Sequence, residues 1–245
     1  MSLQASDIVA YQSANMPEND SNACGGAINL NGLVVFTDLG ANDAVGVVSD
    51  NAGDNESVTI TGRLANGAID SEVLVLNGTT RVPGAKTFER ILKIVLGGAA
   101  AGVVTVDRNT GGAVIKAIPA GITSVRRAFY DSVSDSSPKV LYEKIFLKNT
   151  SGTFSLTNAV ASLSADPSGK MKFALSAAKD DAVSVANRLA APGGLTFVDE
   201  PTTQAVPGVN LGPGEAIGVW LQASLDALEA AIKSSVTVQL RGAST

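Results

Sequence analysis

Apolar and polar residues alternate along residues 57–64, which places Val58 and Ile60 on the same side of the chain. A period of two is the signature of a half-buried β-strand. The dipeptide Asn66-Gly67 follows, and it predicts a hairpin turn of type I′, in which both central residues have a positive φ. The pattern predicts three or four β-strands of one scaffold, which cover residues 57–64, 69–78, 81–88 and 89–96.

Short strands separated by turn residues recur about every ten residues along the rest of the chain, and helical spacing is absent. This recurrence predicts an all-β fold built as an antiparallel sandwich or barrel. The one stretch with good helix propensity, residues 227–235, is too short to be a stable helix alone. The further predicted strands cover residues 28–30, 33–36, 44–50, 102–108, 113–118, 142–148, 154–164, 170–176 and 236–242, with another strand through Trp220.

The segment Pro119-Ala120-Gly121 closes the first strand-rich block, and the composition changes after it. We therefore predict one β-sandwich domain over residues 28–120 and a second over residues 121–245. The two halves do not align with each other, so no internal repeat is inferred.

Residues 1–27 are polar and rich in turn formers, and we predict that they form an extended arm ahead of the first domain. A segment that buries little apolar surface on its own can become ordered on a partner. An alternative stays open, in which the segment packs on its own sandwich as an edge strand. The candidate partner-binding residues of the arm are Ile8, Val9, Tyr11, Met16 and Pro17.

The composition suits a packed β-protein with small side chains, because 45% of residues are hydrophobic and only 4% are aromatic. The net charge is −5 and no block of basic residues is present, which argues against direct binding of nucleic acid. The longest apolar run, residues 91–104, is too short and interrupted to span a bilayer, so we expect no membrane partner. The first residues lack the basic start and apolar core of a signal peptide.

The chain contains no histidine, which excludes Ser-His-Asp and Cys-His catalytic sites and every His-ligated metal site. Its single cysteine, Cys24, stands beside two glycines with no basic residue near it in sequence. We expect it to be a small buried residue and not a reactive thiol. No phosphate-binding or dinucleotide-binding glycine motif is present. We therefore predict no catalytic residue and no cofactor.

Acidic residues and one aromatic residue are the remaining candidates for chemistry. The pairs Asp180-Asp181 and Asp199-Glu200 lie in polar segments, which favours solvated loop charges over a glycosidase pair. Trp220 is predicted as a core residue, with a sugar-stacking platform as the alternative. A calcium site is the alternative suggested by three acidic residues whose spacing does not fit an EF-hand, namely Asp50, Asp54 and Glu56.

Residues 62–91 resemble a pattern of virion structural proteins from tailed bacteriophages, in which a glycine turn precedes two characteristic strands. The second half of the chain is similar to a pattern of Ig-like sandwich domains in phage particles. It departs from that pattern at residues 227–235, where a shorter turn is expected. The residues that carry the two resemblances are Ser71-Glu72, Leu76-Asn77-Gly78-Thr79-Thr80 and Phe88 in the first half, and residues 142–149, 211–215 and 219–221 in the second.

The resemblance implies a non-enzymatic virion protein with two Ig-like β-sandwich domains in tandem behind the arm. It implies a protein that decorates or cements the outer surface of a phage head, with a collar, tail or baseplate component as the alternative within this class. The implied partners are other virion proteins (the major capsid protein, or neck and tail subunits) and copies of itself, so a homo-oligomer is expected. The implied location is the virion, after synthesis in the cytoplasm of the bacterial host. A receptor- or carbohydrate-binding module is the alternative from another class.

Overall fold

The computed structural model describes residues 2–130, 136–228 and 235–245. Strands make up 51% of the structure and helix 1%, which confirms the predicted all-β fold class. The helical element of the described residues is a short 3-10 turn, η1 (Ala5–Asp7). Most of the stretch with good helix propensity, residues 229–234, lies outside the described part of the chain. Within the described ranges, no helix is long and apolar enough to cross a membrane.

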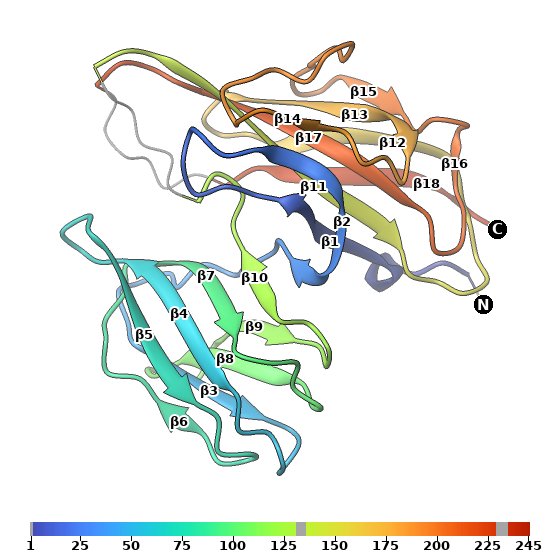
Figure 1. The fold of residues 1–245 in the computed structure, drawn as a ribbon. Helices are drawn as coiled ribbons and strands as arrows, with labels where there is room; N and C mark the ends of the chain where they lie inside the picture. Colours follow the sequence, from blue (N-terminus) through green and yellow to red (C-terminus); the bar gives the residue numbers. More distant parts are fainter. Residues whose placement is uncertain (1, 131–135, 229–234) are drawn as a thin grey trace. The chain divides into compact units, whose positions relative to one another are not determined.

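The chain forms two compact units, and the first is interrupted in sequence by the second (Figure 1). Unit 1 consists of Met1–Asn29 and Asp131–Thr245, and unit 2 of Leu30–Tyr130. The units differ from the two continuous domains predicted over residues 28–120 and 121–245. The difference arises because the first strand of the chain pairs with a strand of the second half, a contact that local patterning does not reveal.

Unit 1 contains two sheets, and its pairings with given registers are antiparallel. The strands of the first sheet are β1 (Ile8–Asn15), β2 (Cys24–Leu33), β11 (Lys139–Asn149), β13 (Met171–Lys179), β14 (Ser184–Val185) and β17 (Ala216–Leu225). Their order is β13-β17-β11-β1-β2, with β14 paired to β2. The strands of the second sheet are β12 (Leu156–Ala165), β15 (Thr203–Ala205), β16 (Asn210–Leu211) and β18 (Thr237–Ser244). In this sheet the other three strands all pair with β12.

The predicted N-terminal arm is part of the first sheet of unit 1. Strand β1 lies between β11 and β2, and its register pairs Ile8 with Asn149 and Gln12 with Ile145. Both edges of β1 are therefore used inside the chain, so this segment is neither a free arm nor an edge strand. The apolar residues are too few to predict a strand by alternation, but β11 provides the backbone partners that the segment needs.

Unit 2 contains the sheet order β2-β10-β7-β4-β5 and a second sheet in the order β6-β3-β8-β9. Strand β2 begins in unit 1, and its last residues, 30–33, belong to unit 2. The pairing of β10 with β2 is parallel, whereas β10 and β7 are antiparallel. The strands are β3 (Val45–Ser49), β4 (Ser57–Arg63), β5 (Ile69–Val75), β6 (Val82–Pro83), β7 (Arg90–Leu96), β8 (Val104–Arg108), β9 (Val114–Ile118) and β10 (Ser124–Arg126).

Alternation along β4 explains the core of unit 2. Val58 and Ile60 are fully buried, as predicted, and Thr59 between them points to the opposite face. They pack in a core with other fully buried side chains, namely Val45, Val47, Phe88, Ile94, Val104 and Val106. The predicted strand over residues 81–88 shrinks to the two residues of β6, because the chain there crosses from one sheet to the other.

The hairpin between β4 and β5 is confirmed, but its turn type is not the predicted one. Gly67 has a φ of +85°, whereas Asn66 is absent from the residues with positive φ. The amide N–H of Gly67 donates to Leu64 O at 2.9 Å, and Leu64 N–H donates to Ala68 O at 2.8 Å. This is a three-residue loop with glycine in the left-handed position, and it needs one positive φ where type I′ needs two.

Candidate functional site

Strand β11 is buried on both of its faces, and it carries a lysine in its middle. The side chain of Lys144 is 0% exposed. Its ammonium lies 4.6 Å from the centre of the Phe146 ring and 5.7 Å from that of Trp220, which stands opposite Lys144 on β17. A fully buried lysine is rare unless it is paired, so its partners decide what this position does.

Four oxygen atoms surround the ammonium group of Lys144. Nζ contacts the carboxylate of Asp181, and it donates to the carbonyl oxygens of Gly26, Asp181 and Val183 at 3.1, 3.4 and 3.4 Å. Gly26 belongs to β2, whereas Asp181 and Val183 precede β14. One side chain therefore fastens three separate segments of unit 1 to one another.

Burial lowers the pKa of Lys144, because water no longer solvates the charge, while the hydrogen bond and charge of Asp181 act in the opposite direction. The surrounding oxygens supply more acceptors than the three N–H donors of an ammonium require. This arrangement fits a charged lysine held in an ion pair, and it leaves no lone pair for attack on a substrate. The site is suited to holding segments together.

A glycine makes room for this lysine. A Cβ atom at Gly218 of β17 would collide with Ser176 Oγ and would stand 2.6 Å from Lys144 Cε. Any larger residue here would displace the lysine side chain. Residues 216–220 therefore provide both the space beside the lysine, at Gly218, and the aromatic wall of the buried site, at Trp220.

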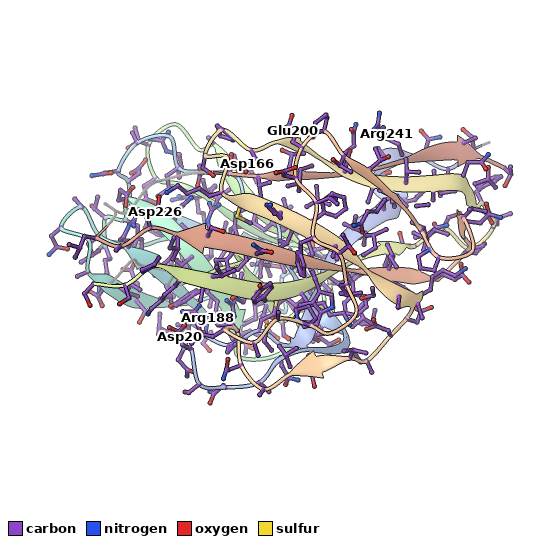
Figure 2. All side chains as sticks on the ribbon, turned by 90° about the horizontal axis from the view of Figure 1, so that it is seen from above. Asp20, Asp166, Arg188, Glu200, Asp226 and Arg241 are labelled. Carbon is purple, nitrogen blue, oxygen red and sulfur yellow. The ribbon has the colours of Figure 1, made fainter. Side chains whose placement is uncertain are left out.

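A second group of charges lies at the edge of β11. Arg188, which follows β14, donates from Nε to Asp20 Oδ1 at 2.5 Å, and Lys139 Nζ lies 3.1 Å from Asp20 Oδ2. The guanidinium of Arg188 is also 4.0 Å from the fully buried carboxylate of Glu143. Figure 2 shows Asp20 and Arg188 next to each other in unit 1, although 168 positions separate them in the sequence.

The electrostatics of this second group favour the charged form of its aspartate. Partial burial acts to raise the pKa of Asp20, but the hydrogen bonds and charges of Arg188 and Lys139 outweigh it and hold the pKa below its usual value. The backbone adds another link, since the N–H of Tyr142 donates to Arg188 O at 2.7 Å. The group ties the β1–β2 loop and the chain after β14 to β11.

Carboxylates in unit 2 fasten loops in the same manner. The hydrogen bond from Ser49 Oγ and those from the backbone N–H groups of Ala101 and Gly102 lower the pKa of Asp54. Asp50 Oδ1 accepts from Val103 N–H at 2.7 Å. The carboxylate oxygens of Asp50 and Asp54 therefore accept hydrogen bonds from backbone N–H groups, whereas a calcium site would require them to face the cation. In the described ranges, no group of three or more His, Cys, Asp or Glu residues is placed to hold a metal ion.

The structure does not gather the predicted partner-binding residues at one exposed site. Ile8, Val9, Tyr11 and Met16 are half-buried in unit 1, and Pro17 is buried. They belong to β1 and to the loop after it, so their side chains contribute to the chain's own fold.

The other sequence predictions have mixed outcomes. Trp220 is 1% exposed and Cys24 is fully buried, as predicted. The sugar-stacking alternative for Trp220 is therefore wrong, because its ring faces Lys144 in the core. The prediction of solvated loop charges is wrong for Asp181, whose side chain is 11% exposed and paired with Lys144. It fits Asp199, which is 63% exposed and lies 3.9 Å from Lys172.

Sequence analysis missed the buried site because its parts are far apart in the chain. Lys144 occupies a regular position in an alternating strand, and Asp181 is one of two adjacent aspartates in a polar segment. The usable signal is the run Ile145-Phe146-Leu147 directly after Lys144, since a lysine drawn into such an apolar segment needs a partner. Comparisons of the chain with protein-family models, with curated proteins and with solved structures find no match.

Proposed function

We propose that this chain is a non-enzymatic structural protein of a tailed-phage particle, which acts through contacts with other virion proteins and with copies of itself. The observation that carries the proposal is how the chain distributes charged and apolar side chains. The ion pairs of Lys144 and Asp20 and the hydrogen bonds accepted by Asp54 fasten segments of the chain's own fold. In contrast, three exposed apolar side chains lie on the edge strand β5, where Ile69, Val73 and Val75 are 39%, 59% and 56% exposed.

The residues of the phage-protein resemblance have structural tasks in unit 2. Leu76 and Phe88 are buried in its core. The carboxylate of Glu72 accepts from the backbone N–H of Ala85 at 2.8 Å, which fastens the return from β5 to β7. Asn77 and Thr80 close the turn after β5, where Thr80 N–H donates to Asn77 O at 2.9 Å. The signature thus consists of fold-determining residues, which supports a shared architecture.

Within the virion class, we favour decoration or cementing of the outer head surface. Rigid sandwiches whose loops are held by charged hydrogen bonds suit a protein that reinforces a lattice through side-by-side contacts. A collar, tail or baseplate position is the alternative. A receptor- or carbohydrate-binding module is the alternative of another class.

The test is immunogold labelling of density-purified particles from the phage that encodes this chain, with antibodies raised against the recombinant protein. We expect the chain to co-purify with particles and the label to cover the head. Label confined to the neck or tail would support the alternative position. Absence of the chain from the particles would refute the proposal, and specific binding on a glycan array would then favour the carbohydrate-binding module.

A further inference from the structure

Strand β5 ends the first sheet of unit 2, and only β4 pairs with it in the sheet order (Figure 1). Its register with β4 runs without a bulge from Ser57 opposite Val75 to Arg63 opposite Ile69. Free strand edges are ready-made templates for pairing with another chain, and natural proteins usually block them with charges, proline or bulges.

The backbone direction along β5 follows from its hydrogen bonds. In an antiparallel ladder, the N–H and C=O groups of one residue point to the same side, and the side alternates along the strand. Leu76 N–H donates to Glu56 O, just before β4, so even-numbered residues face β4. Odd-numbered residues therefore turn their backbone groups outward, and among these are Ser71, Val73 and Val75.

Only the first half of this edge is protected. The outward N–H of Ser71 donates to Asp70 Oδ1 at 2.7 Å, and its outward C=O accepts from Lys86 Nζ at 2.9 Å. Val73 and Val75 have no such cover in the described structure, and their side chains are 59% and 56% exposed. The edge thus carries two successive outward residues with open backbone groups and exposed apolar side chains.

We propose that β5 pairs with β5 of a second copy of this chain, antiparallel about a two-fold axis at Leu74. In this register Val73 lies opposite Val75 of the partner subunit, and Val75 opposite Val73 of the partner subunit. The outward backbone groups of the two valines pair reciprocally, because a two-fold interface presents the same surface twice. The four valine side chains share one face of the joined sheet, as cross-strand neighbours do.

Charge favours a second copy as the occupant. Residues 73–80 carry no charge, while Asp70 and Glu72 lie on the other side of the pairing centre. Antiparallel pairing about Leu74 places Glu72 opposite Leu76 of the partner subunit, so the carboxylates of the two copies do not face each other. A charged strand from another protein would have to leave its charges unpaired beside the valines.

This inference deepens the proposed function, since it names the surface through which copies would meet, but its test needs no phage particle. The experiment is sedimentation velocity of the purified full chain over a concentration series. We expect a monomer–dimer equilibrium for the wild type. Val73→Lys should raise the dimer dissociation constant at least about tenfold, because it replaces an apolar cross-strand contact and places two like charges on the same face beside the two-fold axis.

Val73→Pro is the second variant, and it removes one outward N–H group while the hydrogen bonds to β4 stay intact. It should weaken the dimer as well, which a mere side-chain contact would not require. Val114→Lys is the matched control, because Val114 is 51% exposed on β9, in the other sheet of unit 2. It should leave the dimer unchanged, and thermal melts should show that all three variants fold.

A wild type that stays monomeric at every concentration would overturn the inference. So would a dimer that is insensitive to both Val73 variants, or one that Val114→Lys weakens equally. Each of these results leaves the particle-labelling experiment unaffected, so failure of this contact can be distinguished from failure of the virion role.

Discussion

Removal of the charge of Lys144 is the sharpest test of what holds unit 1 together. Lys144→Met keeps an apolar side chain of similar length against Phe146 and Trp220 and removes only the ammonium. Asp181 is then left with its carboxylate 11% exposed and with one weak backbone donor, Val183 N–H at 3.2 Å. Asp181→Ala makes the opposite change, and leaves the ammonium with carbonyl oxygens alone.

The expected cost follows from the burial of the pair. Breaking a buried ion pair by removal of one partner costs about 3–5 kcal/mol, because the other charge stays uncompensated. Lys144 is 0% exposed, so Asp181→Ala should fall within that range. Because the carboxylate of Asp181 keeps partial access to water, Lys144→Met should cost about 3 kcal/mol, at the lower end of that range. The double variant leaves no buried charge and should cost less than either single change, so the coupling between the two sites should exceed about 1 kcal/mol.

The assay is urea unfolding followed by the fluorescence of Trp220, the only tryptophan of the chain. It reports on unit 1 directly, since its ring lies 5.7 Å from Lys144 Nζ. Lys172→Met is the control, because Lys172 pairs with Asp199 on the surface and the change should stay within about 0.5 kcal/mol. The reasoning is refuted if Lys144→Met is as harmless as the control, or if the costs of the single changes add in the double variant.

Three further predictions test the turn, the packing around the lysine and the response to acid. Gly67→Val should destabilise unit 2 by about 1–2 kcal/mol, because a β-branched residue is forced to a positive φ. The control is Gly98→Val, at a position without positive φ, which should melt near the wild type. Equal melting temperatures of the two variants would contradict the prediction. Gly218→Ala should lower the urea midpoint and shift the fluorescence emission of Trp220, because the new Cβ would collide with Ser176 and press on Lys144. An unchanged spectrum and midpoint would show that the site is loosely packed. The lowered pKa of Asp20 contributes stability that is present above its ordinary value of 3.8 and is lost as the pH falls through the folded-state value. Asp20→Asn should therefore flatten the acid side of the curve of unfolding free energy against pH. Parallel curves for the variant and the wild type would exclude this linkage.

Most strands could be predicted from the sequence because they are built from local alternation or from short apolar runs between turn residues. Residues 57–64 contain β4, whose apolar residues recur with a period of two, and residues 44–50 and 89–96 contain β3 and β7 as apolar runs. The exceptions involve tertiary context. Strand β1 has little apolar pattern and is held by backbone pairing with β11. Residues 121–130 fall in the predicted second domain, whereas the structure places them in unit 2, where β10 pairs with β7.

The buried site was less predictable than the strands. A lysine in an alternating strand is usually outward-facing, and nothing near Lys144 in the sequence indicates that a distant polar segment covers this face of the sheet. Gly218, Trp220 and Asp181 can each be recognised in the sequence, but only as separate residues. Their meeting depends on the pairing of β17 with β11 and on the course of residues 180–185, which only the fold determines.

Unit 1 is assembled from pieces of chain that lie far apart in sequence, and this explains why its charges are placed inside it. Hydrophobic burial is roughly proportional to area and has no direction, so it can draw β2, β11 and the chain around β14 together without fixing their register. Ion pairs and charge-assisted hydrogen bonds are directional, and a misplaced segment would leave Lys144 or Glu143 buried without a partner. The two charge groups therefore specify where the returning segments dock, which no local pattern in the sequence could do. Unit 2 is continuous in sequence and closes by hairpins and short returns, and carboxylates such as Asp50 and Asp54 hold its loops.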